Sequence, residues 1–273
     1  MPQTTANDGT KIHIHVEGDG PDVVLIHGWP LGHDMWKWQI TALTEAGFRV
    51  IAHCRRGFGH SEHAGGGYDY DTMTDDLAAV MKETDARDAA LVGFSMGGGE
   101  VARYMSRHGG RNVSKTALVS AVTPFMLKTD DNPDGVPAET FEKMKQGLRD
   151  DRSAFLKGFA KDFYGQGSSG GGVSDEVLQW THDLAMQASE KATIDCVDAF
   201  GRTDFRPDMA AFSVPTLVIH GTADQTVPID TAGRAAAERI DGAELKEYDG
   251  APHGLYATHT EKLNADLIAF LRG

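Results

Sequence analysis

The sequence lacks any apolar stretch that approaches the length of a membrane span, and its first five residues have neither the charge nor the apolar core of a signal peptide. Positive charge is also scarce. Lys and Arg number 26 against 40 Asp and Glu, which gives a formal net charge of −14. This balance argues against nucleic acid or an anionic membrane as a partner. Because the sequence shows neither a membrane span nor a signal peptide, we expect a cytoplasmic protein.

Cysteine is nearly absent and shows no metal-binding pattern. Cys54 and Cys196 are far apart in the chain and form no C-x-x-C pair, so we expect structural thiols without a disulfide. The 12 histidines include no H-E-x-x-H pattern. His13 and His15 alternate along a strand-like segment, and we interpret them as a solvated strand face rather than a metal site. No metal and no other cofactor is predicted.

What the sequence does contain is a series of apolar runs rich in β-branched residues, in a chain long enough to bury a sizeable core. These runs occupy residues 22–27, 48–53, 89–94, 115–120 and 215–220. Continuous runs of this length are typical of central parallel strands, whereas residues 11–16 alternate like an edge strand. Helical patterns lie between them, at 72–84 and 98–108. The alternation predicts an α/β protein with a mostly parallel, doubly wound sheet.

The alternation lapses between about residues 124 and 212. This stretch favours several helices, around 137–163, 174–190 and 192–201, with a glycine-rich flexible loop at 165–172. We predict a helical cap formed by residues 124–212, placed over the carboxyl edge of a core formed by residues 1–123 and 213–273.

The segment Gly93-Phe94-Ser95-Met96-Gly97 has the pattern G-x-S-x-G, and it lies between a predicted strand and a predicted helix. This context is typical of a nucleophile elbow, where a serine occupies the apex of a sharp turn. Such a turn strains the serine backbone, and the two glycines keep side chains out of a crowded space. The following helix begins under Ser95, so its amides and dipole favour a developing negative charge.

Two further reactive residues follow later strands, in the order Ser95, Asp224, His253. The carboxyl ends of parallel strands form one edge of the sheet, where ligands bind. A serine hydroxyl needs an imidazole to take its proton, and a carboxylate must hold that imidazole in the right tautomer. We therefore predict a catalytic triad of these three residues.

Other residues compete for these roles. Asp230 lies further into the next helical segment, Asp249 is close in sequence to His253, and His259 falls in the final helical region. We expect three histidines at strand ends to hydrogen-bond loops rather than to transfer protons: His27, His53 and His220.

The early loop His27-Gly28-Trp29-Pro30 also follows a strand. We predict that the backbone amides of Trp29 and Met96 form the oxyanion hole. Phe94 and Pro30 are expected in the substrate pocket, with the Trp29 ring as a wall. Pro30 either fixes the direction of the Trp29 carbonyl, so that this carbonyl can accept a hydrogen bond from peroxide, or simply stiffens the loop.

The chain resembles the cofactor-free bacterial haloperoxidases, or perhydrolases, and their aryl esterase relatives, which have the α/β-hydrolase fold. The resemblance rests on these segments: His27–Leu31, Arg55–Ser61, Tyr70–Leu77, Leu91–Tyr104, His220–Asp224 and Ala251–Gly254. It implies the same triad, no metal or haem, and a homo-oligomer, commonly a trimer or larger. One departure is Cys54, where such proteins usually carry Asp, so the bracing of that loop is expected to differ.

These observations favour a serine hydrolase that cleaves small or aryl carboxylic esters, with perhydrolysis as a side activity. A lactonase or a carbon–carbon bond hydrolase with the same triad is the alternative enzyme, and a non-catalytic ligand receptor on this fold is the alternative outside catalysis. Dehalogenases and epoxide hydrolases are disfavoured, because their chemistry places Asp where this chain has Ser95.

Overall fold

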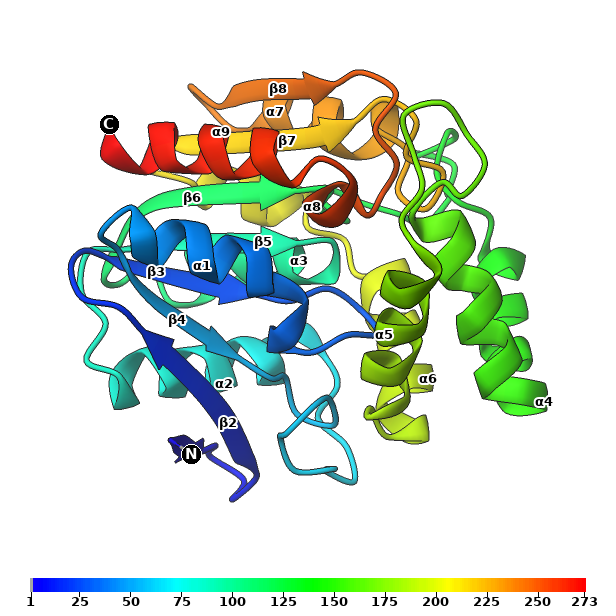
Figure 1. Ribbon diagram of the computed structural model, residues 1–273, viewed down its shortest axis with the longest axis horizontal. Helices are drawn as coiled ribbons and strands as arrows, with labels where there is room; N and C mark the ends of the chain where they lie inside the picture. The colour runs from blue at the N-terminus through cyan, green and yellow to red at the C-terminus, as the bar shows by residue number, and fades with distance from the viewer. Residues whose placement is uncertain (1) are drawn as a thin grey trace.

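A computed structural model describes residues 2–273 (Figure 1). One sheet of eight strands has the order β1-β2-β4-β3-β5-β6-β7-β8. The strands are β1 Gln3–Thr5, β2 Lys11–Glu17, β3 Asp22–Ile26, β4 Arg49–His53, β5 Ala89–Phe94, β6 Val113–Val119, β7 Thr216–Gly221 and β8 Glu244–Tyr248. All pairs from β4 to β8 are parallel, which confirms the predicted sheet. The prediction of an edge strand at residues 11–16 is wrong, because β1 pairs with the outer side of β2.

Helices cover both faces of the sheet. They are α1 Lys37–Glu45, α2 Tyr70–Glu83, α3 Met96–Arg107, α4 Ala138–Phe163, α5 Asp175–Met186, α6 Glu190–Arg202, α7 Ala235–Arg239, α8 Leu255–Thr258 and α9 Thr260–Arg272. Figure 1 shows α1 and α9 in front of the sheet and α2 and α3 behind it. Because both faces are covered, β5 in the middle of the sheet is buried at every residue.

Three inserted helices, α4, α5 and α6, lie beyond the carboxyl ends of the central strands (Figure 1). Their bounds agree closely with the ranges expected from the sequence, and α4 is kinked at Asp151. Helix α5 contacts the core through Trp180, whose ring packs edge-on against Trp38 of α1 with centroids 5.6 Å apart. Lys37 Nζ lies 4.1 Å from the Trp180 ring. The division of the chain into core and cap domains stays a prediction.

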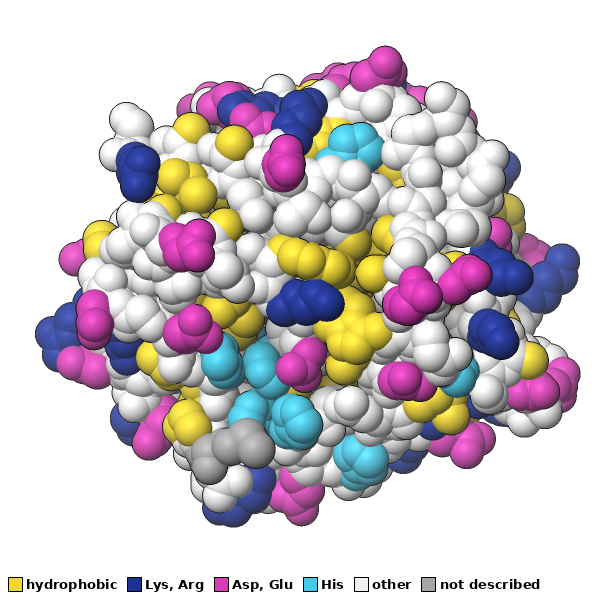
Figure 2. Space-filling view, viewed as in Figure 1, with side chains coloured by type: hydrophobic (Ala, Val, Ile, Leu, Met, Phe, Trp, Pro, Cys, Tyr) yellow, Lys and Arg dark blue, Asp and Glu magenta, His cyan; other side chains and the backbone are white. Residues whose placement is uncertain are grey.

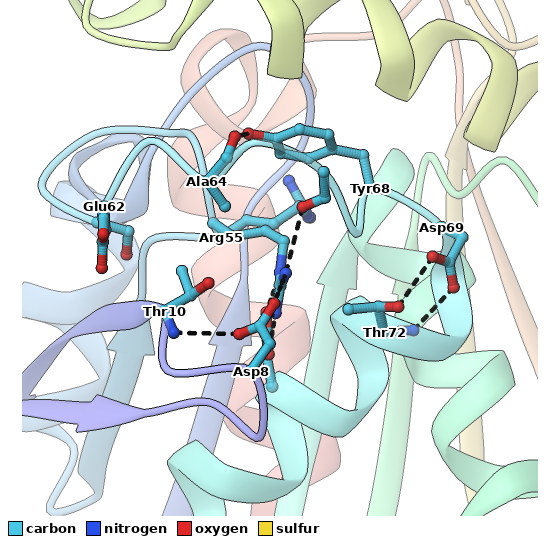
Figure 3. A network of polar contacts seen from close by, with 12 residues as sticks. Asp8, Thr10, Arg55, Glu62, Ala64, Tyr68, Asp69 and Thr72 are labelled. Carbon is cyan, nitrogen blue, oxygen red and sulfur yellow. Dashed lines mark hydrogen bonds and ion pairs between the residues drawn. The ribbon is translucent and has the colours of Figure 1, made fainter.

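The segment that follows β4 is fixed by polar contacts, part of which appear in Figure 3. Arg56 is buried, and its guanidinium donates to Asp76 and to Asp8, with Nε–Oδ2 and Nη1–Oδ2 distances of 2.6 and 2.7 Å. Asp8 also accepts a hydrogen bond from the Thr10 amide, at 3.0 Å. Asp69 caps α2 by accepting hydrogen bonds from the amide and the hydroxyl of Thr72, in the first turn of that helix.

Histidine side chains gather on the face of the molecule near β2 (Figure 2). His13 and His15 share one face, as their spacing predicts, and both rings approach His33, with centroids 5.0 and 5.3 Å apart. The expected solvated face is wrong for His13, which is 7% exposed because His33 and His60 pack over it. Among the described residues, no group of three or more His, Cys, Asp and Glu side chains is arranged to hold a metal ion.

Cys54 and Cys196 are both buried and free, as expected. The sulfur of Cys54 lies 3.2 Å from His33 Nδ1, and its backbone carbonyl accepts a hydrogen bond from the Ser61 hydroxyl at 2.6 Å. Ser61 therefore contributes to bracing the loop that contains Cys54. Across residues 2–273, no helix combines the length and the apolar character that a membrane span requires.

Candidate active site

The turn between β5 and α3 has the strained geometry of a nucleophile elbow. Ser95 has φ 53° and ψ −118°, a region that residues with side chains rarely adopt. A Cβ on Gly93 would lie 2.5 Å from the Gly97 carbonyl oxygen, and one on Gly97 would lie 2.4 Å from the carbonyl oxygen of Ile26. The two glycines are required because the backbones of β3, β5 and α3 meet at this point.

Ser95, His253 and Asp224 form one continuous hydrogen-bonded chain. His253 Nε2 lies 2.9 Å from Ser95 Oγ, and His253 Nδ1 lies 2.7 Å from Asp224 Oδ2. The three residues are 6, 1 and 3% exposed, respectively. Since a carboxylate accepts hydrogen bonds, Nδ1 carries the hydrogen and Nε2 is free to accept the hydroxyl proton. The structure thus brings together the three residues that the sequence singled out.

The Asp224 carboxylate is held by its own loop. The amides of Thr226 and Val227 donate to Asp224 Oδ1 at 2.9 and 2.8 Å, and His220 Nε2 lies 3.3 Å from Oδ2. Burial alone would raise the pKa of Asp224, but the charge of His253 and the hydrogen bonds from His220 and His253 outweigh burial and hold it well below its usual range. Asp224 therefore remains an acceptor for His253 throughout the neutral pH range.

The competing residues lie elsewhere. Asp230 pairs with Arg234 on the surface, and Asp249 lies 3.4 Å from the Thr222 hydroxyl. The imidazole of His259 contacts the hydroxyl of the neighbouring Thr258. These groups face other partners rather than Ser95.

The loop that follows β3 approaches Ser95 closely. A Cβ on Gly28 would lie 2.6 Å from the Phe94 ring and 3.2 Å from Ser95 Cβ, so only glycine allows this approach. The next residue, Trp29, is fixed by its ring, whose Nε1 donates to the Thr193 carbonyl of α6 at 2.9 Å. The assignment of the Trp29 and Met96 amides as oxyanion donors stays a prediction, and the proximity of their loops to Ser95 supports it.

A buried ion pair that sequence reasoning missed connects this loop to α3. Arg55 Nη2 donates to the His27 carbonyl at 2.7 Å, and the Arg55 amide donates to His27 Nε2 at 2.9 Å. Its guanidinium also pairs with Glu100 of α3, with an Nε–Oε1 distance of 2.6 Å. Burial raises the pKa of Glu100 while Arg55 opposes that shift. The signal was present in the Arg-Arg-Gly and Gly-Gly-Gly-Glu motifs, but their spacing does not identify them as partners.

A cavity of about 200 Å³ opens above Ser95, with a mostly apolar wall. It is lined by Trp29, Ser95, Val122, Met126, Val136, Thr140, Phe141, Met144, Phe159, Asp162, Phe200, Gln225, Thr226, Val227 and His253. The Trp29 ring forms part of the wall, as expected. Phe94 and Pro30 do not line it, contrary to expectation. The Phe94 ring is fully buried against His253, and Pro30 lines a smaller cavity beside Leu31.

A strained serine elbow on a parallel sheet, hydrogen-bonded to a histidine and a buried carboxylate, defines the class of serine hydrolases with the α/β-hydrolase fold. The chain belongs to the α/β-hydrolase family, whose model, described as the alpha/beta hydrolase fold, matches residues 21–260. It is therefore an enzyme of the esterase and non-heme haloperoxidase kind.

Individual relatives are similar over their full length. A non-heme chloroperoxidase of Kitasatospora aureofaciens is 46% identical, with 99% of each chain covered. A bifunctional esterase/perhydrolase of Acinetobacter calcoaceticus is 41% identical, with 100% of each covered. The crystal structure of a bromoperoxidase from Bacillus anthracis has a TM-score of 0.95 and 42% identity, and the match covers 100% of this chain and 99% of that one.

Proposed function

We propose that this protein hydrolyses small or aryl carboxylic esters through an acyl–Ser95 intermediate. The observation that carries the proposal is the hydrogen-bonded chain from Ser95 Oγ through His253 to Asp224, at the base of an apolar cavity. His253 takes the hydroxyl proton as Oγ attacks the ester carbonyl, and then gives it to the leaving alcohol. The Trp29 and Met96 amides stabilise the negative charge on the carbonyl oxygen.

Deacylation repeats these steps with a second nucleophile. Water loses a proton to His253, attacks the acyl carbon and releases the carboxylic acid, and the proton returns to Ser95 Oγ. Hydrogen peroxide in place of water releases a peracid, which oxidises halide ions in solution. We include this perhydrolysis in the proposal because one relative is named an esterase/perhydrolase and another a non-heme chloroperoxidase. Assembly as a homo-oligomer and a cytoplasmic location also belong to the proposal, and light scattering tests the assembly.

Substitution of the nucleophile tests the proposal directly. Ser95→Ala is expected to abolish hydrolysis of p-nitrophenyl acetate while leaving the melting temperature nearly unchanged, because loss of a triad member costs orders of magnitude in rate. Adding His253→Ala to Ser95→Ala should cost little more, because the triad acts as a unit. Residual activity within about tenfold of the parent, or additive losses, would contradict the assignment.

Perhydrolysis has its own measurement. Peracid formation from acetate and hydrogen peroxide is compared with ester hydrolysis in the parent and in Pro30→Leu. If Pro30 directs the Trp29 carbonyl toward the peroxide, the ratio of the two activities changes about two- to tenfold, the worth of one hydrogen bond. An unchanged ratio makes Pro30 a scaffold residue only.

A further inference from the structure

Among residues 2–273, one carboxylate side chain, that of Asp162, lines the mostly apolar cavity above Ser95. Asp162 is exposed and lies in the last turn of α4. It comes three positions after Phe159, which lines the same cavity. Residues with this spacing lie on the same side of a helix. Within residues 2–273, no lysine or arginine lines this cavity. The solvent-facing part of the cavity therefore presents a negative charge that no cation in its wall neutralises.

The basic residues nearest to Asp162 in sequence face another part of the surface. Lys157 and Lys161 belong to the same helix but line a separate hollow against α5. Aromatic rings supply much of the remaining wall, and the Trp29 ring packs edge-on against Phe159 with centroids 5.2 Å apart. Aromatic faces attract cations electrostatically. The carboxylate and the rings thus favour the same sign of charge.

We propose that this cavity selects esters whose non-reacting end carries an alkylammonium group, with Asp162 as the specificity-determining residue. The inference rests on the ester hydrolysis proposed above and names a substrate class for the same site. An ester with a free carboxylate is a poor substrate, because Asp162 repels that carboxylate and no lysine or arginine among the lining residues offsets the repulsion. Because Asp162 is in contact with water, the preference is modest and decreases as salt is added.

The test uses two esters of matched shape and different charge, 3-(trimethylammonio)phenyl acetate and 3-tert-butylphenyl acetate. The measured quantity is the ratio of kcat/KM for the cationic ester to that for the neutral ester, which cancels effects common to both. We expect Asp162→Asn to lower this ratio about two- to fivefold, the effect of one partly solvated charge pair. High salt should reduce the ratio more in the parent protein than in the variant, because the remaining net negative charge of the variant still attracts the cationic ester.

The matched control is Asp19→Asn, which removes the same charge from the loop between β2 and β3, at the opposite end of the sheet from Ser95. Its ratio should equal that of the parent. An unchanged ratio in Asp162→Asn, or an equal fall in the control, overturns the inference. If the protein cleaves p-nitrophenyl acetate but neither test ester, the two are compared as competitive inhibitors, and the same ratio of inhibition constants in parent and variant overturns it. Failure to cleave p-nitrophenyl acetate overturns the proposed function instead.

Discussion

His220 contacts the triad without touching Ser95. Its Nε2 lies 2.8 Å from the Val227 carbonyl oxygen and 3.3 Å from Asp224 Oδ2, and its ring is completely buried. Both neighbours are acceptors, so Nε2 carries the hydrogen and donates to both. His220 therefore acts as a positioning residue that joins the Asp224 carboxylate to the loop on which it lies.

Replacement of this donor tests the role. His220→Leu keeps the approximate volume but removes the N–H, and we expect kcat/KM for p-nitrophenyl acetate to fall about tenfold, since hydrogen bonds to charged groups are among the stronger ones. The acid limb of the pH profile should move to higher pH, because Asp224 then binds His253 more strongly. His220→Gln restores a donor at a similar distance from the backbone and should recover much of the rate. Equal activity in all three proteins would show that His220 only fills space.

Sequence reasoning at this scale singled out Ser95, Asp224 and His253, which the structure brings together, because each follows a strand and their order is typical of the class. It did not find Arg55 or Glu100. Their partnership depends on two segments that are distant in sequence and meet beside the loop that follows β3. The sequence also does not specify the direction in which a side chain points, so it predicts Phe94 and Pro30 in the cavity although neither lines it.

Helix α3 lies close to the segment after β6 and to α2 because its first turn consists largely of glycine. A Cβ on Gly98 would lie 2.3 Å from Ala121 Cβ, and one on Gly99 would lie 2.6 Å from the Tyr70 ring. The Tyr70 hydroxyl in turn donates to the Met96 carbonyl at 3.0 Å. The close approach places the N-terminal end of α3 at Ser95, so the glycines serve the site through the position of the helix.

Two glycine substitutions should have opposite effects on stability. Gly97→Ala places a methyl group against the Ile26 backbone, which cannot move without disturbing β3, and we expect it to lower the free energy of unfolding by about 1–3 kcal/mol or more. Gly158→Ala, in the exposed part of α4 with nothing within 4 Å of the new Cβ, should raise it by about 0.5–1 kcal/mol. Urea unfolding measures both. Stabilisation by Gly97→Ala would contradict the packing argument.

Buried strands and long helices were predictable because their apolar runs are continuous or periodic. The expected strand at 89–94 is β5 to the residue, and the expected helix at 137–163 is α4 to within one residue. Strand β1 has only three residues, which are too few to show an alternating pattern of apolar and polar side chains. Its absence from the prediction is also why β2 was placed at the edge of the sheet.

The molecule as a whole buries several histidines away from the candidate active site. Burial lowers the pKa of His13, His27, His33 and His53, to about 4 in His33 and to about 3 in His53. For His53 the positive charge of Arg55 adds to the effect of burial. These imidazoles stay neutral in the folded protein at pH values where an unfolded chain would protonate them.

Stability should therefore decrease in mild acid. An unfolded histidine titrates near pH 6.5, so between about pH 6.5 and about pH 4 the unfolded chain binds more protons than the folded one. The free energy of unfolding then falls with falling pH, by up to about 1.4 kcal/mol per pH unit for each buried histidine. Urea midpoints at about pH 5 should lie well below those at about pH 7.

His53→Gln removes one of these buried imidazoles. It should reduce the slope of the free energy of unfolding against pH by the contribution of one proton, whatever its effect on absolute stability. The control His63→Gln replaces an exposed imidazole and should retain the parent slope. The comparison of slopes also removes the general effect of a net charge that shrinks as pH approaches the sequence pI of about 5.2. Equal slopes in the parent and His53→Gln would mean that the buried His53 is not a source of the acid sensitivity.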